Sequence, residues 1–150
     1  MNKLIERHDI SENQKAHNAY SKLSELLKEL EFKNLPSETV SVINDEVEEL
    51  NSISSSDKQL LKIIKDKENK IIRLIVNKHK IVPANYYRKL WMILGMSSFG
   101  IPLGVVFGIS IGNLALLGIG MPIGMAIGIG IGSIMDKKAN TEGRQLQCKV

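Results

Sequence analysis

A run of 46 residues, from Leu90 to Met135, contains no Asp, Glu, Lys, Arg or His, and this run limits the folds that the chain can adopt more than any other part of it. Apolar stretches of about 18 residues already indicate membrane-spanning helices. A single helix of this length would extend about 69 Å at about 1.5 Å per residue, more than twice the roughly 30 Å of a bilayer's hydrocarbon core. We therefore expect two crossings, as helices of about 22 residues each, joined near Gly112 and Asn113.

Basic and aromatic residues flank this uncharged run and predict its orientation. Positive charge is retained on the cytosolic side, and Tyr and Trp rings favour the headgroup layer. The sequence thus predicts a multi-pass protein of the cytoplasmic (inner) membrane with both termini in the cytosol. An alternative places the aromatic rings in a soluble core. The residues assigned to the membrane interface are Tyr86, Tyr87, Arg88, Lys89, Trp91, Lys137 and Lys138.

Glycine is concentrated in the same run, which holds eleven of the twelve glycines. Eight of them recur every four residues in two sets, so each predicted helix carries one glycine stripe. Because lipid provides little hydrophobic drive for helix association, such stripes favour packing by close backbone approach. The predicted helix-packing residues are Gly100, Gly104, Gly108 and Gly112 in the first helix and Gly120, Gly124, Gly128 and Gly132 in the second.

The two glycine segments form an internal repeat, because residues 100–112 (GIPLGVVFGISIG) align without gaps to residues 120–132 (GMPIGMAIGIGIG). Folding the run back at Gly112 would bring Gly104 level with Gly120 and Gly100 level with Gly124. Pro102 and Pro122 would then kink both helices at the same depth. Alternating Ile and Gly near residue 129 also permits a strand, which the glycine content disfavours.

With these motifs the sequence resembles the glycine-zipper transmembrane domains of bacterial envelope proteins. The resemblance covers residues 95–132 and implies packed helices and a homo-oligomer. It implies no particular activity, since such domains occur in anchors and in pore-formers.

Residues 1–83 are predicted to form a cytosolic three-helix region, followed by a transmembrane glycine-zipper hairpin over 84–136 and a flexible cytosolic tail over 137–150. Apolar residues fall on one stripe of each helix. The first helix is expected over about 11–32, the second from about Pro36, and the third from the serines at 54–56 to about Val82. The stripes are Ala16, Tyr20, Leu23, Leu27 and Leu30; Val40, Ile43, Val47 and Leu50; and Leu60, Ile64, Ile71, Leu74 and Ile81.

The third helix leaves two arrangements open, because its apolar residues follow heptad spacing that Lys67 and Lys78 interrupt. An extended coiled coil is one. The favoured one is an antiparallel bundle, in which an acidic second helix lies against the basic third helix. The fold class is therefore all-α, with a cytosolic helical bundle or coiled coil followed by a two-helix transmembrane hairpin.

Residue types that carry chemistry are sparse. His8, His17 and His79 lack the spacing of metal ligands, and the acidic group at residues 45–49 lacks a calcium-loop glycine. Cys148 is expected to be a loose tail thiol. We predict no catalytic, cofactor or metal site. Basic residues at 57–89 adjoin the predicted span, which favours lipid headgroups over nucleic acid as their partner.

Two functions remain from these observations. The first is a membrane scaffold or anchor that self-associates through its glycine helices and presents the bundle to a cytosolic protein partner. The alternative is an oligomeric pore-former, holin-like or toxin-like, lined by Ser97, Ser98, Ser110 and Asn113. Ion-translocating roles are disfavoured because the run contains no ionisable residue.

Overall fold

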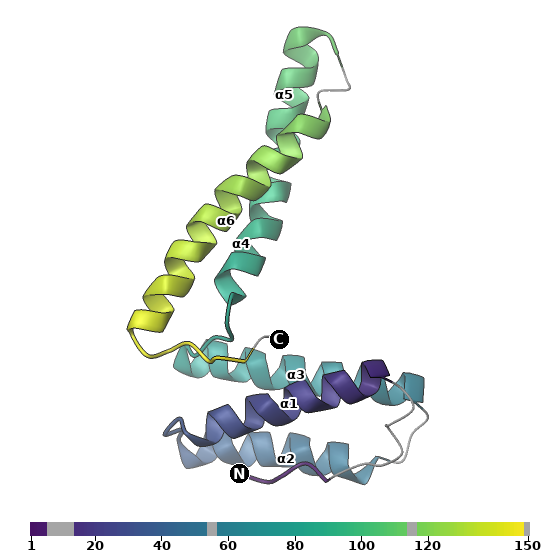
Figure 1. The fold of residues 1–150 in the computed structure, drawn as a ribbon, viewed down its shortest axis with the longest axis vertical. Helices are drawn as coiled ribbons and strands as arrows, with labels where there is room; N and C mark the ends of the chain where they lie inside the picture. Colours follow the sequence, from purple (N-terminus) through teal and green to yellow (C-terminus); the bar gives the residue numbers. More distant parts are fainter. Residues whose placement is uncertain (6–13, 54–56, 114–116, 149–150) are drawn as a thin grey trace. The chain divides into compact units, whose positions relative to one another are not determined.

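The computed structural model of the protein describes residues 1–5, 14–53, 57–113 and 117–148. These residues are mostly α-helical and include no β-strand, which confirms the predicted all-α class. The chain divides into two units (Figure 1). One comprises Met1–Pro83 with Leu146–Val150, and the other comprises Ala84–Gln145.

The first unit is a bundle of three helices, α1 (Gln14–Glu31), α2 (Ser37–Ser52) and α3 (Asp57–His79). Both α1 and α2 pack against α3, so this region is a bundle and not an extended coiled coil (Figure 1). The predicted serine turn at 54–56 lies outside the described residues. The largest fully buried side chains are Leu23, Leu26, Leu30, Ile43, Val47, Leu50, Leu60, Ile64, Ile71, Ile75 and Leu146.

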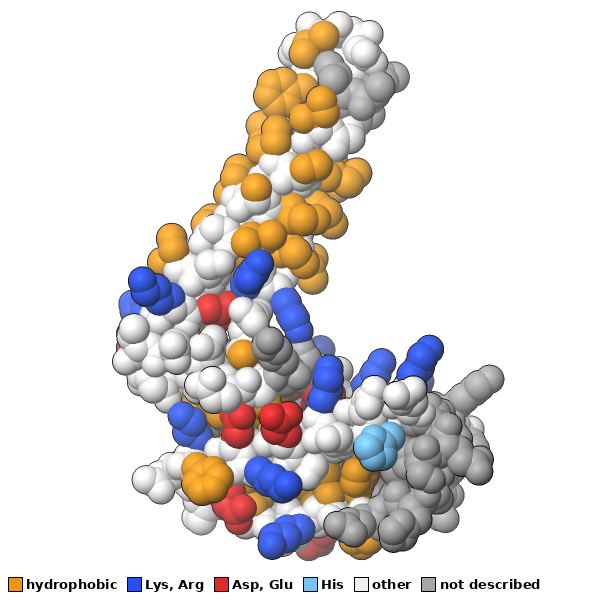
Figure 2. All heavy atoms as spheres, viewed as in Figure 1, with side chains coloured by type: hydrophobic (Ala, Val, Ile, Leu, Met, Phe, Trp, Pro, Cys, Tyr) orange, Lys and Arg blue, Asp and Glu red, His pale blue; other side chains and the backbone are white. Residues whose placement is uncertain are grey.

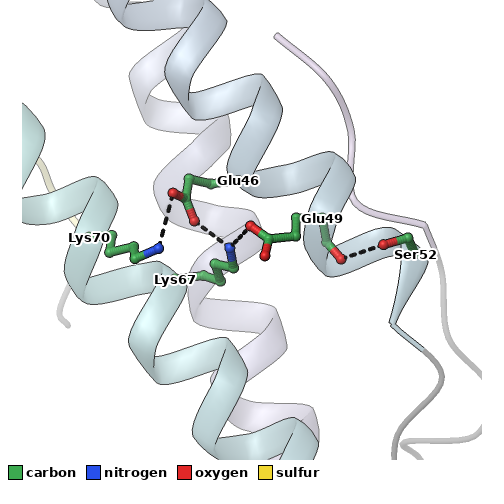
Figure 3. Close-up of polar contacts among 5 residues, drawn as sticks. All are labelled: Glu46, Glu49, Ser52, Lys67 and Lys70. Atoms are coloured by element: carbon green, nitrogen blue, oxygen red, sulfur yellow. Dashed lines mark hydrogen bonds and ion pairs between the residues drawn. The ribbon is translucent and has the colours of Figure 1, made fainter.

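Opposite charges join α2 to α3, as the sequence predicts. The Lys78 Nζ lies 2.8 Å from a Glu38 carboxylate oxygen. Further along, Glu46 accepts from Lys67 at 2.5 Å and from Lys70 at 3.3 Å (Figure 3). The glutamate nearer the start of α2 pairs with the lysine nearer the end of α3, and the later glutamate pairs with earlier lysines. The two helices are therefore antiparallel.

Lys67 occupies an apolar position of the α3 heptad pattern, yet only 6% of its surface is exposed. Its ammonium group donates to both Glu46 and Glu49 (Figure 3). Burial alone would lower the pKa of Lys67, but the hydrogen bonds and charges of the two glutamates outweigh it and raise that pKa. Lys67 is therefore part of the bundle's interior, held there by its ion pairs.

α3 ends at His79, a few residues before the predicted end near Val82. Lys80 adopts a left-handed conformation (φ 58°) and its N–H donates to the Val76 carbonyl, which closes the helix in an αL motif. Because this cap completes the last turn, the chain leaves the helix before it reaches Pro83.

The predicted flexible tail over 137–150 is wrong in two respects. α6 (Leu117–Thr141) continues well past residue 137. Beyond it, Leu146 and Cys148 are almost fully buried in the first unit, and the Leu146 N–H donates to the Val82 carbonyl. Burial, with the nearby Glu29 and Glu25, raises the pKa of Cys148 to about 12, so it is not a loose thiol.

The second unit is a helical hairpin. Its first arm comprises α4 (Tyr86–Gly95), the π-helical turn η2 (Met96–Gly100) and α5 (Ile101–Ile111), and its second arm is α6. Gly112 ends α5 at φ 67° in a Schellman motif: its N–H donates to the Ile109 carbonyl, and that of Asn113 to the Gly108 carbonyl. The chain reverses where the sequence predicts.

Candidate functional site: an apolar helical hairpin

The outer surface of the hairpin consists of large apolar side chains (Figure 2). Among the residues that the structure describes, fifteen large apolar residues of this unit are exposed, against three in the first unit. The two arms, Tyr86–Ile111 and Gly118–Thr141, are each long and apolar enough to cross a membrane. The exposed residues are Leu90, Ile93, Leu94, Phe99, Ile101, Val105, Val106, Phe107, Ile109, Ile111, Ile119, Met121, Ile123, Ile127 and Ile134.

The interior of the hairpin is built from glycine. The buried glycines are Gly95, Gly100, Gly104, Gly108, Gly120, Gly124, Gly128 and Gly132. A Cβ added to Gly120 would lie 2.6 Å from the Gly104 Cα, and one added to Gly124 would lie 2.7 Å from the Gly100 Cα. These are the two glycine pairs that folding at Gly112 predicts. No side chain fits between the arms at these levels, so the backbones themselves are in contact.

Contact continues below these pairs toward the open end of the hairpin. A Cβ on Gly128 would lie 3.1 Å from the Met92 Cα, and one on Gly132 would lie 2.5 Å from the Arg88 Cα. Glycines of α6 here face ordinary residues of α4, because α4 carries no glycine before Gly95. Close packing therefore extends from the level of Gly104 and Gly120 to that of Arg88 and Gly132.

Gly95 was not among the predicted packing residues, because it lies five positions before Gly100 and breaks the four-residue period. In the structure a Cβ on Gly95 would lie 2.9 Å from the Gly128 Cα. The π-helical turn Met96–Gly100 explains this placement. A π-turn accommodates one extra residue per turn, so it returns Gly95 and Gly100 to the same face.

Gly112 requires a correction, since it does not pack in the hairpin. Apart from its chain neighbours, nothing lies within 4 Å of the position that its Cβ would take. Its left-handed conformation ends α5, and glycine adopts that conformation more readily than residues that carry a Cβ. The period of four continues to Gly112 because the turn also needs glycine there.

The prolines lie level with each other, Pro102 between Gly100 and Gly104 and Pro122 between Gly120 and Gly124. Pro102 stands in the first turn of α5, directly after η2, and Pro122 lies inside α6. The N–H of Ile101 donates to the Met96 carbonyl, five residues back. The looser π-turn thus provides space for the Pro102 ring, whose bulk disturbs a regular helix. Kinking at both prolines stays a prediction.

Asp136 closes the open end of the hairpin, a role that the sequence did not reveal. Its Oδ1 accepts the N–H of Tyr87 at 3.0 Å and its Oδ2 accepts the N–H of Arg88 at 2.9 Å. These amides belong to the first turn of α4, where backbone donors lack partners within the helix. Asn85, the residue before α4, provides no side-chain cap. A carboxylate from one arm therefore caps the first helix of the other.

The predicted interface residues gather at this same end. Tyr86 and Tyr87 make an edge-to-face contact with ring centroids 5.4 Å apart. Arg88 and Lys89 are exposed at the start of α4, while Lys137 and Lys138 are exposed in the last turns of α6. Trp91 is half-buried one turn further along α4. Asp136 and the close contact at Gly132 bring these two groups together.

The hydroxyl groups of Ser97 and Ser133 donate hydrogen bonds to carbonyls of their own helices. Ser97 Oγ donates to the Ile93 carbonyl at 3.1 Å, and Ser133 Oγ donates to the Ile129 carbonyl at 2.7 Å. Ser98, Ser110 and Asn113 are exposed. Hydroxyls bonded in this way can face an apolar environment without losing a partner.

Among the described residues, no three His, Cys, Asp or Glu side chains come together as metal ligands would. His79 pairs with Thr39 at 2.8 Å inside the bundle, and His8 lies outside the described residues. Comparison with models of protein families, curated proteins and solved structures gives no significant match.

Proposed function

We propose that this protein is a membrane anchor whose hairpin crosses the cytoplasmic membrane twice and holds the helical bundle at the cytosolic surface, where it engages a protein partner. The observation that supports the proposal is the inverted arrangement of the hairpin, with glycines inside and large apolar side chains outside. A soluble protein rarely exposes a contiguous apolar patch of more than a few hundred Å². In lipid the same surface needs no cover.

Orientation follows from the charges of the hairpin. Its basic residues lie where α4 begins and α6 ends, and the turn near Asn113 carries none. Under the positive-inside rule this end stays in the cytosol. Both termini are then cytosolic, and the turn faces the opposite side.

The predicted homo-oligomer could not form through the same glycine contacts that close the hairpin within one chain. Seven of the eight glycines assigned to packing are buried inside the hairpin. A scaffold of several copies would therefore assemble through other surfaces. Crosslinking in native membranes measures that assembly, and it is separate from the anchoring role.

Membrane insertion is tested by washing membranes that contain the full chain with alkaline carbonate. The protein should remain with the membranes and be released only by detergent. Release by carbonate would reject the proposal. Purified protein in liposomes should also retain a trapped dye, and dye release would favour the pore-forming alternative instead.

Orientation is tested with single cysteines introduced in a Cys148→Ser background. A membrane-impermeant maleimide should label Asn113→Cys in intact cells and should label the matched Lys137→Cys variant only after lysis. The reverse pattern would place the termini outside.

A further inference from the structure

The charged groups of the hairpin unit lie at one end. Residues 84–145 contain five basic and two acidic residues, a net charge of +3, and all seven precede Leu90 or follow Met135. The remainder of both arms is uncharged. Figure 2 shows Lys and Arg side chains at the end of the hairpin where the apolar surface stops.

Both carboxylates of the unit are already engaged. Asp136 is buried and accepts two backbone N–H groups of α4. Glu142 pairs with Arg144, whose Nε donates to it at 2.7 Å, and this hydrogen bond together with the neighbouring positive charge lowers the pKa of Glu142. The unit also has four exposed cations, two on each arm. We call Arg88, Lys89, Lys137 and Lys138 the basic end.

The geometry points to a lipid surface as the ligand. We infer that the basic end binds the headgroups of anionic phospholipids; this rests on the proposed membrane insertion. Two of the cations lie in the first turn of α4 and two directly follow Asp136, so the Asp136 hydrogen bonds to that turn bring all four to the end of the hairpin where the apolar surface ends. Phosphate groups of a bilayer lie at that depth, and each nearby Lys or Arg strengthens attraction to anionic lipid about fivefold.

Trp91 fluorescence provides a direct readout of lipid contact at the basic end, since Trp91 is the single tryptophan and lies three residues after Arg88. The full chain is reconstituted in phosphatidylcholine vesicles that contain brominated lipid, which quenches tryptophan on contact. Brominated phosphatidylglycerol should quench Trp91 more strongly than brominated phosphatidylcholine at the same mole fraction. Equal quenching by the two lipids would overturn the inference.

Charge removal identifies the residues responsible. Lys137→Gln with Lys138→Gln should reduce the preference for the anionic lipid by about fivefold or more. The matched control, Lys22→Gln with Lys28→Gln, removes the same charge from exposed positions of α1 and should leave the preference unchanged. An unchanged preference in the first variant, or an equal loss in both, would overturn the assignment to the basic end.

Two further experiments separate this inference from its alternatives. Inorganic phosphate at a few millimolar should not relieve the quenching beyond the effect of sodium chloride at equal ionic strength; a specific effect of phosphate would replace the lipid assignment with a small-anion site. Carbonate extraction of the same variants tests insertion separately. A protein that stays in the membrane but shows no lipid preference contradicts this inference and leaves the anchor proposal intact.

Discussion

The bundle and the hairpin are both helical, but they place large and small residues on opposite sides. In the bundle, Leu and Ile side chains fill most of the interior, which also holds Lys67 with its ion pairs to α2. In the hairpin, glycines fill the interior and Leu, Ile, Val and Phe side chains cover the outside.

This contrast reflects what holds each unit together. Burying apolar side chains stabilises a bundle because water is excluded from them. In a bilayer, where we propose that the hairpin lies, that gain would be small, and close van der Waals contact of the backbones would hold the helices together instead. Adding a side chain to the contact should therefore disrupt the hairpin, whereas removing one should disrupt the bundle.

The largest expected effect comes from filling the hairpin interior. Gly124→Leu places a side chain against the backbone of Gly95 and Gly100, where even a Cβ would lie 2.7 Å from the Gly100 Cα. We expect a loss of about 3 kcal/mol of packing free energy. Hydrogen exchange of the full chain in detergent should show faster exchange over α4 and α5, together with altered Trp91 fluorescence.

Gly130→Leu is the matched control on the same helix. Nothing lies within 4 Å of its Cβ position, and the residue is exposed. Its exchange pattern should match that of the unmodified protein. Equal disruption by both substitutions would show that helix propensity, and not the contact between the arms, decides the outcome.

The sequence predicted most of this hairpin because its period is simple. Pairing of Gly104 with Gly120 and of Gly100 with Gly124 followed from folding the repeat at its centre, and the structure has both pairs. Gly95 was missed because a π-turn changes the helical period, and a pattern search assumes a constant one. Asp136 was missed because its partners are backbone amides of another helix, which no side-chain motif marks.

The sequence predicted the bundle about as well as the hairpin, and the errors in its predicted buried residues have a similar cause. Ile43, Val47 and Leu50 are buried as predicted, but Ile75 is fully buried where the heptad pattern favoured Leu74. A heptad pattern drifts by about 20° per repeat relative to a 3.6-residue helix, so a pattern extended from Leu60 has moved off the buried face by Leu74. Burial of Leu146 and Cys148 could not be foreseen, because it depends on a segment distant in sequence.

The second largest effect is expected at the end of the hairpin that Asp136 closes. Asp136→Ala removes both acceptors from the Tyr87 and Arg88 amides, and we expect it to weaken the start of α4 by about 2 kcal/mol. Hydrogen exchange at residues 86–90 should accelerate while exchange near Gly104 is unchanged. Lys137→Ala, an exposed neighbour on the same turn, is the control. Unchanged exchange in Asp136→Ala would mean that the cap contributes nothing.

A smaller effect is expected in the bundle at Lys67. Lys67→Ala removes a buried side chain and its pairs with Glu46 and Glu49, but both glutamates retain access to water, at 20% and 64% side-chain exposure. We therefore expect a loss of about 1.5 kcal/mol, less than for a fully buried pair. Lys70→Ala, whose side chain is 62% exposed, should cost less than about 0.5 kcal/mol. Urea unfolding followed by circular dichroism measures both, and equal losses would contradict the special position of Lys67.

The smallest effect is a pH dependence that belongs to the bundle and not to the hairpin. Burial would raise the pKa of Glu46, but hydrogen bonds and charges from Lys67 and Lys70 outweigh it and lower that pKa below its ordinary value of 4.5. Its contribution is thus present above pH 4.5 and is lost as pH falls through the lower, folded-state pKa. Lys67 has a raised pKa, so its contribution is fully present below its ordinary value of 10.5 and is lost as pH rises through the higher, folded-state pKa. The difference in unfolding free energy between the protein and Glu46→Gln should be constant between about pH 5 and 10 and shrink in acid.

Asp45→Asn, an exposed neighbour on α2, controls for the loss of one charge. A parallel pH curve for the two variants would remove the ion pair as the cause of the pH dependence.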